Sequence, residues 1–298
     1  MRELMSTKEV ADHLRLKERK IYDLVAREVI PHSRVSGKLL FPRALVDEWV
    51  RRGMSGAPLA VSRNVPAVLA GSHDPLLEWA VRESRCGLAT MTYGSMDGVD
   101  RLLSGAACAA AIHLPSAKQE RGGDLDRNVA LARDRLAHLD CVLLHWASRE
   151  QGLVLAAGNP LKIKSVADLR KRKTRVIIRQ PGAGSHLLFL QLLAEAGVES
   201  NALSYVNPPA QTESDVAAAI LDGRADAGLA VRAVARQFHL DFLPLAVERL
   251  DIAVLRASYF DPPLQALFAF ARRAPFQRQA KMLAGYDIEE LGRARWNA

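Results

Sequence analysis

Apolar residues recur with helical spacing three times within the first 52 residues. Residues 8–14, 18–28 and 43–50 each place their apolar side chains on one face, which predicts three amphipathic helices. Residues 33–35 and 39–41 flank a short polar turn, which predicts a small hairpin before Pro42 starts the third helix. The predicted order is helix, tight turn, helix, two-stranded wing and helix.

Beyond residue 64, short apolar runs alternate with longer amphipathic segments. This rhythm is typical of a parallel sheet covered by helices, so we expect an α/β fold. Gly53-Met-Ser-Gly-Ala-Pro58 lacks hydrophobic periodicity and predicts a linker over residues 53–64. The predicted strands are 65–70, 88–92, 107–114, 142–147, 152–157, 175–178, 203–206, 225–230 and 242–245, and the predicted helices are 74–82, 95–103, 166–170, 185–196, 214–221 and 231–238.

Composition narrows the class of protein. The 298 residues are 49% hydrophobic and 25% charged, which indicates a globular chain with a full core. No apolar run approaches the roughly 18 residues that cross a bilayer, and the N-terminus has no apolar signal-peptide core, so we expect a cytoplasmic protein without a membrane partner. The three cysteines, Cys86, Cys108 and Cys141, are widely spaced, which argues against a disulfide framework or a zinc knuckle.

Positive charge is concentrated near the N-terminus. Residues 1–52 contain 12 Lys and Arg against 8 Asp and Glu, a net charge of +4, which is half of the +8 of the whole chain. A short basic module ahead of a larger, nearly neutral body indicates that the module contacts a polyanion.

Residues 4–52 resemble the winged helix-turn-helix of the excisionase and MerR-like group. The resemblance is carried by Ser6-Thr-Lys-Glu-Val-Ala11, Lys20-Ile-Tyr22, Ile30-Pro31, Arg34-Val-Ser-Gly-Lys38, Phe41-Pro-Arg43 and Trp49. That group usually has Gly where Arg15 stands and Ser where Lys17 stands, and both departures concern the turn between the first two helices.

The resemblance implies binding to double-stranded DNA. A helix enters the major groove while the tip of a wing contacts phosphates or the neighbouring minor groove. Because one such module covers a single half-site, we expect a homodimer. The predicted DNA contacts are Lys17, Arg19, Lys20 and Tyr22 on the second helix and Arg34, Ser36 and Lys38 on the wing.

Four junctions between a strand and a helix share glycines or small hydroxyl residues. Ligands of α/β sheets bind beyond the carboxyl ends of the strands, where helix N-termini present free N–H groups. The junctions are Gly71-Ser-His-Asp74, Tyr93-Gly-Ser-Met96, Gln180-Pro-Gly-Ala-Gly-Ser185 and Gln211-Thr-Glu-Ser214. If they converge on one cleft, they form a neutral cage of donors suited to an oxyanion or a carboxylate.

Residues 65–298 resemble the type 2 periplasmic-binding-protein-like domain, in the branch that includes molybdate and tungstate sensors fused to helix-turn-helix modules. The resemblance implies a two-lobed clamshell, with lobe I at about 65–157 and 246–298 and lobe II at about 158–245. It is carried by Gly71-Ser-His-Asp74, Gly105, His113-Leu114, Gln151-Gly152, Gly158-Asn-Pro160, Arg179-Gln180 with Gly182 and Gly184, Gly223-Arg-Ala-Asp-Ala-Gly228, Glu248 and Gly285-Tyr-Asp287.

The chain departs from that branch at two of the junctions. Gly182-Ala-Gly-Ser-His186 stands where the branch commonly has Gly-Ser-Gly-Thr-Arg, and Glu213-Ser-Asp215 stands where it more often has Thr-His. An oxyanion and an organic metabolite that donates hydrogen bonds to Glu213 or Asp215 therefore remain open as ligands. The predicted ligand contacts are Ser72, His73, Ser95, His113, Gly182, Ala183, Gly184, Ser185, His186, Thr212, Glu213 and Ser214.

Enzymatic function is not favoured. The histidines near the junctions fit no metal-ligand spacing, and the chain has neither a nucleophile elbow nor a phosphate-binding loop, so we expect no catalytic residues, metal or cofactor. The sequence therefore predicts a transcription regulator in which a small ligand alters DNA binding. A cytoplasmic small-molecule binding protein and a recombination or architectural DNA-binding factor remain the alternatives.

Overall fold

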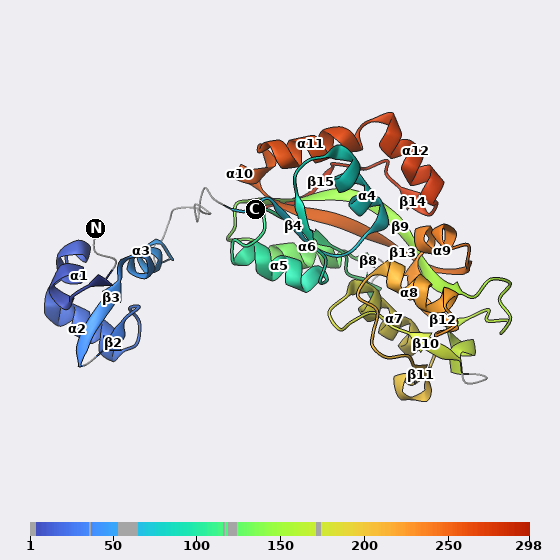
Figure 1. The fold of residues 1–298 in the computed structure, drawn as a ribbon, viewed down its shortest axis with the longest axis horizontal. Coiled ribbons are helices and arrows are strands. Elements are labelled where there is room, and N and C mark those ends of the chain that lie inside the picture. The colour runs from blue at the N-terminus through green and yellow to red at the C-terminus, as the bar shows by residue number, and fades with distance from the viewer. Residues whose placement is uncertain (1–3, 36, 53–64, 116, 119–123, 171–173) are drawn as a thin grey trace. The chain divides into compact units, whose positions relative to one another are not determined.

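The chain forms two compact units, Met1–Ala60 and Val61–Ala298 (Figure 1). A computed structural model describes residues 4–35, 37–52, 65–115, 117–118, 124–170 and 174–298. Within these residues, no helix has both the length and the apolar character needed to cross a membrane.

The described residues of the small unit form three helices and a three-stranded antiparallel sheet. Its elements are β1 (Leu4–Met5), α1 (Thr7–Leu14), α2 (Glu18–Ala26), β2 (Ser33–Val35), β3 (Lys38–Pro42) and α3 (Arg43–Arg52), with strand order β1-β3-β2. Ser6 and Glu9 form a reciprocal capping box at the start of α1. The buried core is Met5, Val10, Ala11, Ile21, Val25, Ile30, Phe41 and Val46.

Residues in left-handed conformation end both α1 and α2. Arg15 has a φ of 54°, and Leu16 N donates to Ala11 O at 2.9 Å. Glu28 also has a φ of 54°, and Val29 N donates to Leu24 O at 2.9 Å, so α2 ends at Ala26 rather than at Glu28 as predicted. Glycine is the usual residue in such a helix ending because it has no Cβ. Arg15 thus adopts, at this turn, the left-handed conformation that glycine usually occupies, at the cost of some backbone strain.

The large unit is built on one ten-stranded sheet. Along the main path the order is β11-β10-β12-β9-β13-β6-β4-β5, and β14 and β15 pair with β9. The strands are β4 (Val68–Gly71), β5 (Ala89–Met91), β6 (Ala109–Ile112), β9 (Cys141–Leu155), β10 (Arg175–Ile177), β11 (Ser204–Tyr205), β12 (Ala227–Val231), β13 (Asp241–Leu255), β14 (Tyr286–Asp287) and β15 (Ala294–Asn297). A separate pair joins β7 (Ala117–Lys118) to β8 (Asp124–Leu125).

Helices cover both faces of the sheet in each lobe. In lobe I, α4 (Pro75–Ser84), α11 (Pro262–Ala271) and α12 (Ala274–Leu283) pack on one face, and α5 (Ser95–Leu103) and α6 (Arg127–Arg135) on the other. In lobe II, η1 (Val166–Arg170) and α7 (Gly184–Glu195) face α8 (Glu213–Leu221) and α9 (Arg232–Gln237) across the sheet. The short segments η2 (Ser200–Ala202) and α10 (Arg256–Tyr259) complete the unit.

Two long strands run through both lobes. In lobe I, β9 pairs with β13 from Cys141 onward, and at its other end Gln151–Leu155 pairs with β12 of lobe II. The sequence predicted two strands, at 142–147 and 152–157, where the structure has one. Leu153 and Leu155 pack in the lobe II core, although the sequence placed them in lobe I. The lobes are therefore connected through continuous sheet.

Candidate functional site

The four predicted junctions lie at helix starts, and the structure brings residues from both lobes together there. The backbone N–H of Glu213, at the start of α8, donates to His73 Nδ1 at 3.3 Å. A Cβ on Gly94 would lie 3.0 Å from the carbonyl oxygen of Gly182. A Cβ on Gly184 would lie 2.3 Å from His113 O and 2.4 Å from His113 Nε2. Lobe I and lobe II are therefore in contact at these junctions, and only glycine fits at position 184.

A chain of hydroxyl groups lies at the start of α5. Ser95 Oγ donates to His113 O at 2.8 Å and accepts from His113 N at 3.1 Å. Ser72 Oγ lies 2.7 Å from Ser95 Oγ. Because the single hydroxyl proton of Ser95 is already on His113 O, Ser72 donates to Ser95. Both hydroxyl protons are thus engaged within the protein, and Ser72 presents only lone pairs to a ligand.

His73 is engaged at both of its ring nitrogens. Nδ1 accepts the Glu213 N–H, and Nε2 lies 3.1 Å from the carboxylate of Glu78. A neutral imidazole carries one proton, so this arrangement places it on Nε2, directed at Glu78. The hydrogen bond from His73 lowers the pKa of Glu78.

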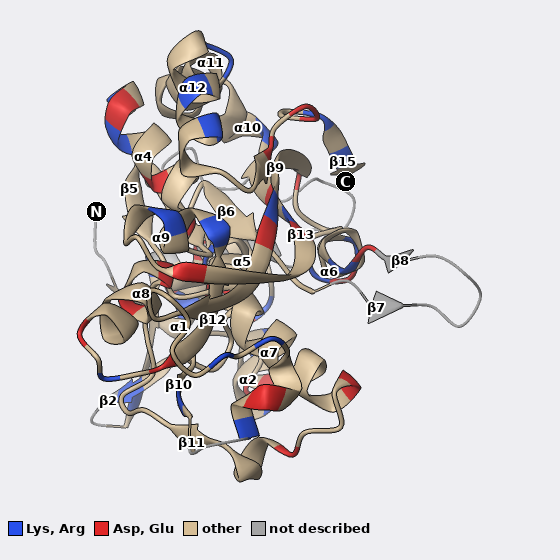
Figure 2. Ribbon diagram, turned by 90° about the vertical axis from the view of Figure 1, so that its right-hand side faces the viewer, with Lys and Arg blue, Asp and Glu red and all other residues tan. Residues whose placement is uncertain are grey.

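A buried ionic cluster sits where β9 and β13 pass between the lobes, with both signs of charge on β9 (Figure 2). Arg149 Nε donates to Glu248 Oε1 at 2.7 Å, and its Nη1 donates to Asp74 Oδ2 at 2.8 Å. Tyr286 Oη also donates to Asp74 Oδ2, at 2.8 Å. Burial by itself would lower the pKa of Arg149, but the carboxylates of Glu248, Asp74 and Glu213 raise it, so the guanidinium stays charged.

A second buried ion pair belongs to lobe II. Arg179 Nη1 donates to Glu213 Oε1 at 2.9 Å, and Val231 N donates to Glu213 Oε2 at 3.2 Å. Both oxygens of the Glu213 carboxylate are therefore engaged. Asp215 is also engaged, because its Oδ2 accepts from Thr212 N at 2.8 Å and closes a capping box at the start of α8.

Several buried polar atoms between the lobes have no hydrogen-bond partner among the described residues. Such atoms are uncommon in folded proteins, where ordered water or a bound molecule usually completes the bonding. Gln151 Nε2 donates to Glu248 Oε1 at 2.9 Å, and His113 Nε2 lies 3.7 Å from the same oxygen. The atoms without hydrogen-bond partners are His113 Nδ1 and Nε2, Arg149 Nη2, Gln151 Oε1, Gln180 Nε2, Ser185 Oγ, His186 Nδ1 and Glu248 Oε2.

Burial disfavours the charged form of the two histidines in this group. Burial, reinforced by the positive charge of Arg149, lowers the pKa of His113 well below its usual value. Burial also lowers the pKa of His186, which is the less buried of the two. Neutral His113 therefore has one donor nitrogen and one acceptor nitrogen available.

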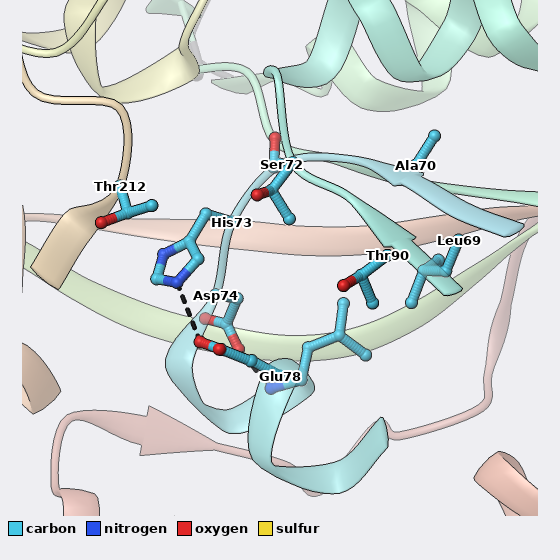
Figure 3. Close-up of a pocket in the computed structure, with 10 residues that line it drawn as sticks. Leu69, Ala70, Ser72, His73, Asp74, Glu78, Thr90 and Thr212 are labelled. Atoms are coloured by element: carbon cyan, nitrogen blue, oxygen red, sulfur yellow. Dashed lines mark hydrogen bonds and ion pairs between the residues drawn. The ribbon is translucent and has the colours of Figure 1, made fainter. Parts of the chain in front are cut away.

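A pocket of about 120 Å³ opens beside the junctions, bounded by both lobes (Figure 3). Figure 3 shows His73 and Thr212 lying near each other from different elements, with Glu78 bonded to His73. Of the predicted ligand contacts, Ser72, His73 and Thr212 line this pocket, whereas Ser214 lines a different one next to Arg236. The full lining is Leu69, Ala70, Ser72, His73, Asp74, Leu77, Glu78, Thr90, Thr92 and Thr212.

Arg149, Thr90 and Thr92 have no role predicted from the sequence. Arg149 lies with Glu150 and Gln151 between two apolar runs of β9, and charged residues at such a position are a usable signal of a buried site. The family resemblance rests partly on Arg179, Gln151 and Glu248, but no ligand contact was predicted for these three residues. The described residues contain no group of three or more His, Cys, Asp or Glu arranged to hold a metal ion.

The predicted DNA contacts lie on the surface of the small unit. Arg19 and Tyr22 are three residues apart on α2 and share one face, and Tyr22 is 53% exposed. Lys20 pairs with Asp23 at 2.9 Å on the neighbouring face. Lys17, Arg34 and Lys38 are also exposed, whereas Ser36 lies outside the described residues.

Comparisons with known proteins match both units. A family model described as "PBP superfamily domain" matches residues 78–272, and one described as "Helix-turn-helix domain" matches residues 4–54. The uncharacterized protein YvgK of Bacillus subtilis (strain 168) is 23% identical over 303 residues, covering 96% of this chain and 95% of that protein. The sulfate-binding protein SubI of Mycobacterium tuberculosis H37Rv has a TM-score of 0.50 and 15% identity, covering 74% of this chain and 85% of that one. These matches confirm the predicted fold class and the helix-turn-helix module.

Proposed function

This chain belongs to the PBP superfamily and carries an N-terminal helix-turn-helix domain, and on that premise we propose that it is a ligand-responsive transcriptional regulator. Its small domain is of a DNA-binding type, and its large domain is of a type that binds small molecules. The observation that carries the proposal is the set of buried, unpartnered polar atoms between the two lobes, in the same chain as a helix that exposes Arg19, Lys20 and Tyr22.

In the proposed DNA complex, α2 enters the major groove and the β2–β3 hairpin contacts the backbone. Tyr22 and Arg19 face the base edges from one side of α2, and Lys20 leaves its surface pair with Asp23 to contact phosphate. Arg34, Ser36 and Lys38 form the wing contacts. Two such modules, one from each subunit of a homodimer, read two half-sites of an operator in the cytoplasm.

In the proposed ligand complex, a small molecule lies between the lobes. Its contacts come from lobe I at Ser72, His73, Ser95 and His113, and from lobe II at residues 182–186 and 212–214. Two classes of ligand are considered, a molybdate- or tungstate-like oxyanion and a small organic metabolite such as a carboxylate. Ligand binding favours the closed lobes and thereby changes operator affinity, since a ligand shifts an equilibrium by its difference in affinity for the two states.

The proposal is tested by selecting operator fragments from sheared genomic DNA with the full-length protein. Affinity for a selected fragment is then measured at several salt concentrations, with and without a compound that raises the thermal stability of the protein. We expect nanomolar binding that weakens steeply with salt, and a change in affinity on addition of the compound. R19A and K38A should weaken binding, whereas R278A on α12 serves as a matched control.

Two results would contradict the proposal. Operator affinity that is the same with every stabilising compound would point to an architectural or recombination factor. A protein that binds small molecules but shows no salt-dependent DNA binding would be a binding protein whose small domain serves another purpose.

A further inference from the structure

The buried ionic groups between the lobes carry an excess of negative charge. Among the described residues, the buried carboxylates of this region are Asp74, Glu213 and Glu248, and the buried guanidiniums are Arg149 and Arg179. Each guanidinium is already bonded to a carboxylate, Arg149 to two of them and Arg179 to one. His113 adds no positive charge, because burial lowers its pKa. The site therefore presents no free buried cation to an anion.

Three of the hydroxyl and imidazole donors predicted for an oxyanion are engaged within the protein. The proton of Ser95 lies on His113 O, the proton of Ser72 lies on Ser95, and the ring proton of His73 is directed at Glu78. A fully deprotonated oxyanion needs donors on all sides. The donors that remain are Ser185 Oγ, Gln180 Nε2, Arg149 Nη2 and a ring nitrogen of His113 and of His186. They can bind an acidic group of a ligand, but as donors they leave the buried acceptors at the same place unsatisfied.

Two acceptors at the same place remain unpaired. Glu248 Oε2 and Gln151 Oε1 are buried without partners, while Glu248 Oε1 takes the bonds from Arg149 and Gln151. Glu248 is 3% exposed and Gln151 is 0% exposed, so bulk water does not reach them freely. A ligand completes this pair only by donating N–H or O–H hydrogens.

The lining of the neighbouring pocket has the same character. It contains Asp74 and Glu78 but no Lys or Arg, and its remaining polar side chains are Ser72, His73 and three threonines. Asp74 and Glu248 are bridged by Arg149, so the pocket and the unpaired acceptors belong to one connected network.

We propose that the effector is an organic molecule that donates at least one N–H or O–H hydrogen bond to Glu248 and Gln151, such as a hydroxy acid, an amino acid or a polyol. This rests on the proposed function, since it assigns the ligand class of the same interlobe site. Tetrahedral dianions without protons, such as molybdate, tungstate and sulfate, leave both acceptors unpaired and add negative charge beside three carboxylates.

The first test compares the two classes on the full-length protein by thermal shift and isothermal titration calorimetry. The dianion probes are molybdate, tungstate and sulfate at mildly alkaline pH, where they carry no proton. The donor probes are the standard amino acids, small hydroxy acids and small polyols. We expect saturable binding of at least one donor probe and none of a dianion up to about 1 mM. Saturable binding of a dianion, or no binding by the whole donor panel, would overturn the proposal.

The second test uses variants against the donor probe that binds. Gln151→Met keeps the side-chain length but removes the unpaired acceptor, and we expect affinity to fall about tenfold. Glu248→Gln should weaken the same ligand, whereas for a dianion the loss of a negative charge would strengthen binding. Q277M, on the exposed face of α12, is the matched control and should bind as the parent does. If E248Q does not fold, Q151M still decides, because unchanged affinity in Q151M overturns the proposal.

Operator binding is measured on the same samples. If the protein binds a donor ligand but no DNA, the proposed regulatory function is refuted, whereas the proposed ligand class is not. Salt-dependent DNA binding together with dianion binding would refute the ligand class alone.

Discussion

Ser95 binds both backbone groups of His113, accepting from its N–H at 3.1 Å and donating to its carbonyl at 2.8 Å. This places the His113 backbone against the start of α5 and presents the imidazole toward Gly184 and Glu248. One hydroxyl in lobe I thereby positions a side chain that contacts lobe II.

Ser95→Ala should destabilise the protein by about 1–3 kcal/mol, because it leaves the buried His113 N–H and carbonyl without partners. Urea unfolding measures the change. Ser104→Ala is the matched control, since the Ser104 hydroxyl is a surface donor to Arg101 O and its loss should change little. Equal stability of S95A and the parent would show that water replaces the serine.

Arg149→Met should cost about 3–5 kcal/mol of unfolding free energy. The substitution keeps much of the side-chain length but leaves the carboxylates of Asp74 and Glu248 buried without their cation. Arg175→Met, which breaks a more exposed pair with Asp226, should have little measurable effect. Chemical denaturation of the two variants side by side checks the contrast, and similar losses in both would contradict it.

Stability should fall at acid pH, and His113 should account for part of the fall. Since burial lowers the pKa of His113 in the folded state, the unfolded chain binds the proton first as pH drops. The folded protein then loses about 1.4 kcal/mol per pH unit below about pH 6.5, until the lowered folded-state pKa is reached. Above about pH 6.5 this loss of stability is absent.

His113→Asn should flatten this part of the profile, as measured by urea unfolding at a series of pH values. His186→Asn should flatten it less, because the pKa of His186 is lowered in a less buried position. A slope that is identical in H113N and the parent would show that other groups control the acid response.

Gly184→Ala should prevent the lobes from closing fully, because the added methyl group would lie 2.3 Å from His113 O. Hydrogen exchange should become faster at the first turns of α7 and α8. Gly87→Ala is a useful control, since nothing lies near the absent side chain of Gly87, whose φ of 77° makes alanine unfavourable for backbone reasons alone. It should lower overall stability without changing exchange between the lobes.

Arg15→Gly should stabilise the small unit by about 1 kcal/mol, because glycine adopts the left-handed conformation without the steric cost of a Cβ. Scanning calorimetry of the full-length protein checks this through the transition of the small unit. Arg27→Gly, at a position with a φ of −93°, should instead lower the stability.

Local signals made the helix starts predictable. Asp74 caps α4 through Leu77 N at 2.8 Å, Thr212 caps α8, and α5 spans the predicted residues 95–103. Capping and turn residues act over a few positions, so their effect can be read from the sequence. The same holds for α1 and for the β2–β3 hairpin.

Long-range pairing made the centre of the site harder to predict. Arg149, Glu150 and Gln151 interrupt the apolar pattern of β9, so the sequence indicated a break between two strands. In the structure, Arg149 lies opposite Glu248 in the ladder with β13, and the two neutralise each other while buried. Residues 99 positions apart in the chain satisfy each other there, which no local pattern reveals. The helices α6, α11 and α12 were also not predicted.

The continuity of β9 and β13 has a consequence for how the large unit is divided. Each lobe depends on the other for the far half of its two central strands, so cutting the chain between the lobes would leave both fragments with severed ladders. Movement of one lobe against the other must bend or twist these strands, where register shifts flank the crossing between Pro244 and Ala246 and between Leu250 and Asp251. Opening of the large unit therefore requires bending of two paired strands, and the resistance of these strands to bending limits it more than the length of connecting loops does.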